Sequence, residues 1–172
     1  MTIPQEQRNV LEAMGIGLLL LQNAERVIRL CMTVVLQKQA LTLNLFTQQE
    51  EAERIRTIGY FLAELRKRAA VHPTVDALLV DFLKNRNDFV HDLSRVPTWN
   101  LRTPEGVVRS GEFVHNLIRQ TEQVIKVFAG LVVAWQEQLG MSEPSLPNDD
   151  WFSEIATVYK PLASYVFRAK NA

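Results

Sequence analysis

The feature that most constrains the fold is the spacing of apolar residues, which recur at steps of three and four along most of the chain. Over residues 5–37 this row consists of Val10, Met14, Gly17, Leu21, Ala24, Ile28, Cys31 and Val35. Such spacing has the 3.6-residue period of a helix with one apolar face. Further apolar residues widen the face, which is typical of a bundle helix that packs on two sides.

Four further segments carry the same helical signature, over residues 47–70, 74–94, 107–139 and 151–170. Pro161 should kink the last of these helices. Only residues 41–46 alternate as a strand would, and that stretch is too short to found a sheet. We therefore predict an all-α fold, an antiparallel helical bundle of four to five helices.

Residues at the segment ends divide the chain further. Thr47 and Glu50 form a capping-box pattern, and Thr74 is expected to cap the third helix. The loop over residues 94–106 is long for a compact helical domain, and such loops are more often functional than plain connectors. We divide the chain into a bundle over residues 1–140 and an acidic hinge with a C-terminal helix over residues 141–172. That last helix packs on the bundle or on a second subunit.

Composition limits what such a bundle can do. The chain has 19 basic and 19 acidic residues, so indiscriminate coating of nucleic acid is not expected. Cys31 is the only cysteine, which excludes an internal disulfide and a multi-cysteine zinc site. No apolar run reaches the roughly 20 residues of a membrane span, and the first residues lack a secretory signal. We expect a soluble, cytoplasmic protein that uses no metal or cofactor and has no membrane partner.

One short segment, residues 84–93 with the sequence KNRNDFVHDL, carries residues suited to chemistry. Arg86 offers a planar fork of donors to phosphate oxygens, and His91 is a side chain type that exchanges protons near neutral pH. Asn87 precedes His91 by one helical turn, so it can orient the imidazole or bind substrate. RNA carries its own nucleophile, the 2′-hydroxyl, so its cleavage needs only a proton acceptor and a cation.

In this segment the sequence resembles the HEPN superfamily, whose signature is Arg, four to six residues and His, often with a polar residue after the Arg. The resemblance implies a small helical bundle, commonly a homodimer, and in many members a metal-independent endoribonuclease. It therefore implies catalytic roles for Arg86, His91 and Asn87 in a toxin or defence effector, controlled by an antitoxin or a neighbouring-gene protein. Where the HEPN toxins paired with a nucleotidyltransferase carry a modified tyrosine, this chain has Leu93, so that mode of control loses its acceptor.

Helix geometry sets a condition on this site. Five residues of α-helix turn through about 500°, so Arg86 and His91 should point about 140° apart. We therefore expect either a break in the helix near the motif or a composite site that combines two copies across a two-fold axis. In the second case the monomer should be inactive.

Each motif residue also has a purely structural interpretation. Arg86 continues the apolar row of its helix, so a buried salt bridge to a glutamate of the first or second helix is the alternative to catalysis. His91 would otherwise be an ordinary surface or half-buried histidine. The two remaining histidines, His72 and His115, have no partners at metal-ligand spacing and are expected to be structural or surface residues.

The loop after the motif holds candidate substrate-binding residues. Trp99, Arg95 and Arg102 would form a lip that stacks a base and binds phosphate. Against this, a tryptophan in a loop usually packs on its own domain. Two functions therefore remain open: a HEPN-like endoribonuclease acting on RNA, and a non-catalytic HEPN-like helical dimer that binds a protein or nucleotide partner.

Overall fold

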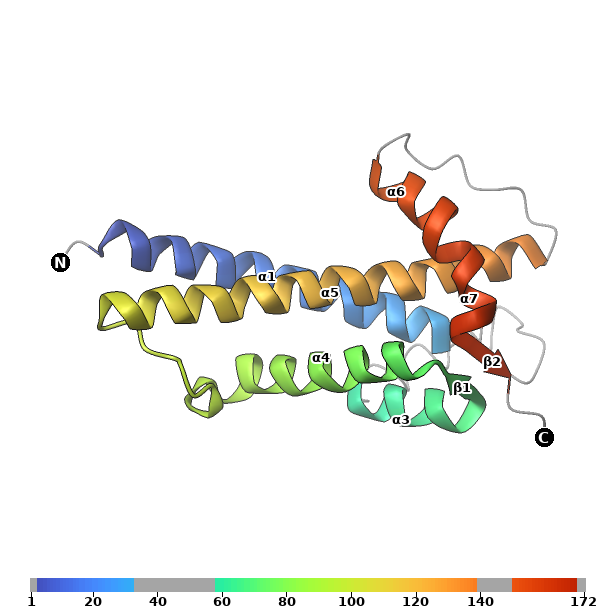
Figure 1. Ribbon diagram of the computed structural model, residues 1–172, viewed down its shortest axis with the longest axis horizontal. Coiled ribbons are helices and arrows are strands. Elements are labelled where there is room, and N and C mark those ends of the chain that lie inside the picture. The colour runs from blue at the N-terminus through green and yellow to red at the C-terminus, as the bar shows by residue number, and fades with distance from the viewer. Residues whose placement is uncertain (1–2, 33–57, 139–149, 170–172) are drawn as a thin grey trace, which may run out of the picture.

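The computed structural model describes residues 3–32, 58–138 and 150–169, and helices make up most of them. The α-helices are α1 (Gln5–Leu30), α3 (Ile58–Arg68), α4 (Pro73–His91), α5 (Pro104–Gln138), α6 (Asp150–Glu154) and α7 (Lys160–Val166). The shorter elements are a 3₁₀-helix η2 (Leu93–Arg95), a π-helix η3 (Ile155–Tyr159) and two strands, β1 (Ala69–Val71) and β2 (Phe167–Ala169). The predicted all-α class is confirmed (Figure 1).

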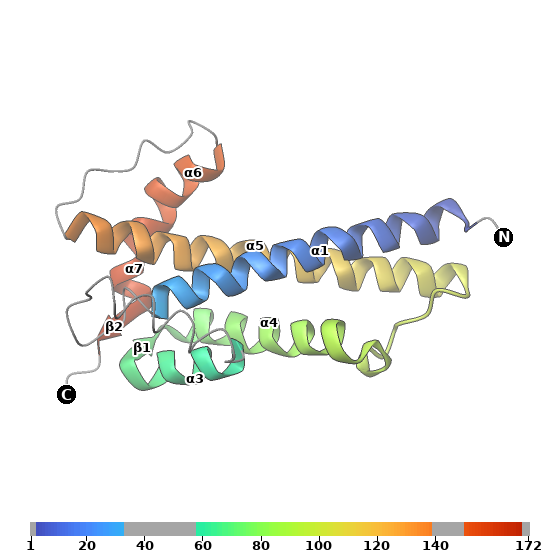
Figure 2. The same ribbon diagram turned by 180° about the vertical axis from the view of Figure 1, so that it is seen from behind.

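The two long helices α1 and α5 lie side by side along the molecule, and α4 packs against α5 (Figures 1 and 2). The chain runs in the same direction in α1 and α5, whereas it runs in the opposite direction in α4. The predicted antiparallel arrangement therefore holds for α4 but not for the α1–α5 pair. Within the described ranges, no helix is both long enough and apolar enough to cross a membrane.

The apolar row predicted for the first helix faces the core. Its buried members are Val10, Gly17, Leu21, Ala24, Ile28 and Cys31. Gly17 lies where three helices meet, because a Cβ there would be 3.7 Å from Ile118 and 3.8 Å from Phe89. The Cys31 thiol donates to the carbonyl oxygen of Phe128 at 3.2 Å, and burial raises its pKa well above the ordinary value. Cys31 is therefore a core residue that stays protonated.

The start of α4 differs from the prediction, because the capping side chain belongs to His72 rather than Thr74. Pro73 is the first helical residue, where its missing N–H costs nothing. The Nδ1 atom of His72 accepts from the backbone N–H of Thr74 at 3.3 Å. The same ring contacts Tyr165, with Nε2 3.0 Å from the hydroxyl and the ring centroids 4.8 Å apart. A histidine is not among the usual cap residues, so the sequence pattern favoured the nearby threonine.

At its other end α4 stops at His91, three residues earlier than predicted. Asp92 has extended backbone angles, with φ −160° and ψ 83°, and its side chain accepts from the backbone N–H of Ser94 at 3.1 Å. This contact starts the short helix η2 and turns the chain away from the axis of α4. The motif histidine is therefore the last residue of its helix.

The single C-terminal helix predicted over residues 151–170 is wrong in detail. The chain forms α6, then the π-helix η3 directly before Lys160 and Pro161, then α7 and finally β2. Proline has no N–H for the helical ladder, and π-helical turns accommodate such interruptions. Strand β2 pairs antiparallel with β1, so that Ala69 lies opposite Ala169. Three-residue strands are too short to show alternation, which is why the sequence did not indicate them.

The C-terminal elements pack on α5 of their own chain, one of the two positions predicted for them. The approach is close at Gly130, where a Cβ would lie 2.7 Å from the backbone of Tyr159. Two ion pairs, Lys126–Glu154 and Lys160–Glu137, join the same surfaces. The predictions for Val35, for the capping box at Thr47 and for residues 140–149 lie outside the described residues.

Candidate functional site

The motif lies on the C-terminal half of α4. Arg86 lies between the buried residues Phe82 and Phe89 in the apolar row, and its side chain is only 15% exposed. Asn87 and His91 are exposed. The Arg86 side chain therefore points towards the core, whereas Asn87 and His91 lie at the surface.

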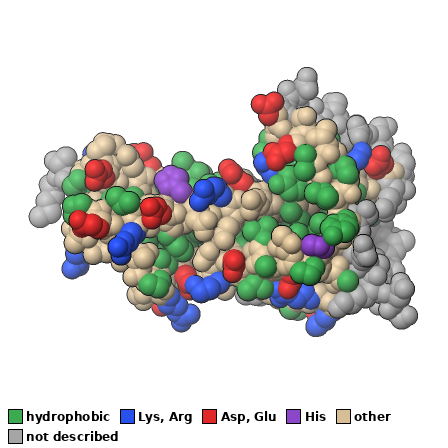
Figure 3. All heavy atoms as spheres, in the orientation of Figure 1, with side chains coloured by type: hydrophobic (Ala, Val, Ile, Leu, Met, Phe, Trp, Pro, Cys, Tyr) green, Lys and Arg blue, Asp and Glu red, His purple; other side chains and the backbone are tan. Residues whose placement is uncertain are grey.

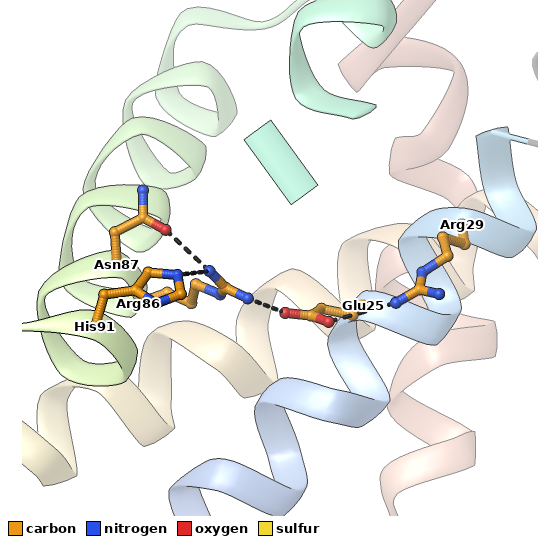
Figure 4. A network of polar contacts seen from close by, with 5 residues as sticks. All are labelled: Glu25, Arg29, Arg86, Asn87 and His91. Carbon is orange, nitrogen blue, oxygen red and sulfur yellow. Dashed lines mark hydrogen bonds and ion pairs between the residues drawn. The ribbon is translucent and has the colours of Figure 1, made fainter. Parts of the chain in front are cut away.

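The Arg86 guanidinium connects α4 to α1 (Figure 4). Its Nη2 atom donates to Oε1 of Glu25, on α1, at 2.7 Å. Its Nη1 atom donates to Oδ1 of Asn87 at 3.0 Å and lies 3.1 Å from Nε2 of His91. On the far side, Oε2 of Glu25 is 3.5 Å from Nη2 of Arg29. The site is thus a polar network of five side chains, in which the alternative predicted for Arg86, a salt bridge to a glutamate of the first helix, is present.

The network also leaves one donor without an acceptor. The Nε atom of Arg86 is buried and has no hydrogen-bond partner among the described residues. Buried donors normally have partners, and an orphaned one costs free energy. The guanidinium is therefore held only through its two terminal nitrogens.

The predicted separation of Arg86 and His91 is wrong. The two side chains are in contact within one chain, on one helix that continues to His91. The angle of about 140° describes only the direction in which each side chain leaves the helix. The arginine is long enough for its guanidinium to reach beyond its own turn, and His91 lies at the open end of the helix. A second copy is therefore not needed to bring the pair together.

The loop residues do not all join this site. Trp99 is half-buried and packs edge to face on Phe113 of α5, with ring centroids 6.4 Å apart, so it stabilises its own domain. Arg95 binds Asp92, directly after the motif, at 3.1 Å. Arg102 is exposed and forms no ion pair with any described residue. Of the three predicted lip residues, only Arg95 is tied to the end of the motif helix.

The residue after the motif helix has a perturbed carboxyl group. Hydrogen bonds from Ser94, with a smaller contribution from Arg95, hold the pKa of Asp92 below its ordinary value of 3.8. Asp92 is therefore an anion near neutral pH, next to the exposed imidazole.

Glu25 is the member of the network that sequence reasoning did not name. It lies four residues after Leu21 and three before Ile28, both buried, and thus borders the apolar face of α1. A carboxylate at the border of a buried row, opposite a helix with an arginine in its own apolar row, is the signal that could have identified it.

The wider surface shows no broad charged region on the face in Figure 3, where acidic and basic side chains are interspersed. In the parts of the chain that the structure describes, no group of three histidine, cysteine, aspartate or glutamate side chains is placed to hold a metal ion. Comparisons with models of protein families, with curated proteins and with solved structures find no match.

Proposed function

We propose that this chain is a metal-independent endoribonuclease of the HEPN type, in which Arg86 and His91 act on the scissile phosphate and Asn87 supports them. The observation that carries the proposal is the 3.1 Å contact between Nη1 of Arg86 and Nε2 of the exposed His91. A fixed cation beside a base is the arrangement that cleavage by an internal hydroxyl requires.

The reaction follows from these two groups. Nε2 of His91 takes the proton of the ribose 2′-hydroxyl, and the 2′-oxygen attacks the adjacent phosphorus. The bond from phosphorus to the 5′-oxygen breaks, and the leaving oxygen takes a proton from water. The hydroxide that remains is neutralised by the proton that His91 releases, which restores the free imidazole. The products are a 2′,3′-cyclic phosphate and a free 5′-hydroxyl. The guanidinium of Arg86 stays in place, and the phosphate oxygens replace His91 and Asn87 as acceptors from its Nη1 donors, so that it stabilises the negative charge that accumulates there.

The resemblance supplies the remaining parts of this proposal. They are a HEPN-like bundle, a homodimer with a composite site, a cytoplasmic toxin or defence effector, and an antitoxin or neighbouring-gene protein as its partner. Because Arg86 and His91 already meet within one chain, a dimer would contribute a second copy of the pair or a wall of the substrate groove.

A second candidate is a non-catalytic helical dimer that binds a protein or nucleotide partner. The observation in its favour is the 2.7 Å ion pair between Arg86 and Glu25, whose side chains are only 15% and 21% exposed. In this candidate Arg86 holds α4 against α1, and the motif stabilises the fold.

The test is RNA cleavage in EDTA by the wild type, His91→Ala and Arg86→Lys. We expect cyclic phosphate ends from the wild type and at least a 100-fold loss of rate in both variants. His115→Ala is the matched control, because His115 is an exposed helical histidine whose Nδ1 lies 2.8 Å from the carbonyl oxygen of Gly111. Equal activity in all four proteins would show a contaminating nuclease and favour the second candidate.

A further inference from the structure

We infer that Glu25 is a positioning residue of this site, which acts through Arg86 to fix the ring nitrogen on which His91 carries its proton. The inference rests on the proposed function for its catalytic meaning. Its structural content rests on the contacts among Glu25, Arg86, Asn87 and His91.

The first step concerns the imidazole. A guanidinium has N–H donors and no acceptor. The 3.1 Å contact is therefore a hydrogen bond only when Nε2 of His91 carries no proton. A neutral His91 in this contact must hold its proton on Nδ1, because the partner of one ring nitrogen determines the state of the other.

The second step concerns the contact that orients the guanidinium of Arg86. This group is planar and rigid, so a strong contact at Nη2 determines where Nη1 points. Glu25 supplies that contact at 2.7 Å, and both side chains are largely shielded from water. Asn87 accepts from Nη1 at 3.0 Å but, as a neutral neighbour on the same helix, it cannot replace a charged anchor from α1. With Nε unpartnered, Glu25 is the only charged hydrogen-bond partner of the guanidinium among the described residues.

The third step concerns charge. Glu25 compensates the charge of Arg86, so the imidazole does not face an unbalanced cation. Arg29 lies 3.5 Å from the other carboxylate oxygen and is further from the motif. The order Arg29, Glu25, Arg86, His91 thus alternates charge and ends on an unprotonated Nε2, the atom that must accept the 2′-hydroxyl proton in the proposed reaction.

The experiment reads the tautomer directly, by long-range ¹H–¹⁵N NMR of the imidazoles at neutral pH. The chain has only three histidines, so their signals can be assigned by single substitutions. In the wild type we expect His91 in the Nδ1–H form. In Glu25→Ala, and in the nearly isosteric Glu25→Gln, we expect His91 to lose that form and show averaged signals. Arg29→Gln, which touches Glu25 but not Arg86, should leave His91 unchanged.

The same variants are assayed for RNA cleavage. We expect Glu25→Ala to lower kcat at least 10-fold with less than a 3-fold change in KM. The variant loses the orientation of Arg86 and His91 but keeps every other side chain that could bind RNA. Wild-type signals of His91 in both folded Glu25 variants would overturn the inference even if RNA is cleaved. A tautomer change in a protein that cleaves no RNA would instead support the positioning role of Glu25 and reject the proposed ribonuclease.

Discussion

The two ends of α4 each carry a histidine, and the two are held in opposite ways. At the start, Nδ1 of His72 accepts a backbone N–H, so its proton lies on Nε2, which donates to Tyr165. At the end, Nε2 of His91 accepts from Arg86, so its proton lies on Nδ1. His72 uses both nitrogens to stabilise the fold, whereas Nδ1 of His91 makes no hydrogen bond to any described residue. The comparison shows that one residue type on one helix can be structural at one end and available for chemistry at the other.

The helix dipole accentuates this difference. A positive charge is unfavourable at the start of a helix and favourable at its end. Protonation of His72 would also remove the acceptor that caps α4, because Nδ1 would become a donor. Protonation of His91 would break only its contact with Arg86. The cap of α4 therefore depends on an unprotonated Nδ1 in His72, whereas no turn of α4 depends on the hydrogen bond that His91 makes.

The largest effect on stability should come from breaking the ion pair between Arg86 and Glu25. Glu25→Leu leaves a largely buried guanidinium unpaired, so we expect a loss of about 2 kcal/mol in the free energy of unfolding, less than for a fully buried pair. Adding Arg86→Met removes the orphaned charge and should recover most of that loss. Urea unfolding at neutral pH measures both proteins, and a double variant no more stable than Glu25→Leu would show that the pair is not coupled.

A smaller effect on stability should distinguish His72 from His91. His72→Ala removes a helix cap and a ring contact, so we expect a loss of about 1 kcal/mol. His91→Ala should change stability by less than about 0.5 kcal/mol, since an exposed side chain is removed. His72→Asn restores a capping acceptor and serves as the control. If His91→Ala proves more costly than His72→Ala in thermal or urea unfolding, the assignment of roles is reversed.

The smallest effect concerns the turn after His91. The folded-state pKa of Asp92 lies below 3.8, so its anion favours the folded turn above that pH, and this contribution disappears as the pH falls through the lowered pKa. Hydrogen exchange of the Ser94 amide should be slower in the wild type than in Asp92→Ala at pH 5. The two proteins should converge once the pH has fallen below the lowered pKa of Asp92. Arg95→Gln should have the weaker effect, because Ser94 contributes most to the lowered pKa; a difference that persists in acid would contradict this account.

Much of the helical framework follows from local pattern. The buried row of α1 and the positions of α4 and α5 could be predicted, because apolar periodicity reports which face a helix buries. A salt bridge between Arg86 and an early glutamate was likewise predictable as a type of contact, since a cation in an apolar row needs a partner. Which glutamate pairs with Arg86 could not be predicted, because that depends on how far α1 and α4 are shifted along each other.

The failures have equally specific causes. The meeting of Arg86 and His91 was missed because backbone geometry does not report how far a long side chain reaches. The cap at His72 was missed because cap preferences favour threonine over histidine. The pairing of β1 with β2 joins two short segments with no pattern of their own, which meet where α7 packs on α5 and where His72 contacts Tyr165.

The β1–β2 pair has a consequence for how the chain reaches its native state. Ala69 and Ala169 lie about one hundred residues apart in sequence, so the strands can join only after a long loop has closed. During synthesis β1 and α4 emerge while β2, the partner of β1, is still inside the ribosome. The strand that leads into the motif helix is therefore paired only when the residues of β2 arrive.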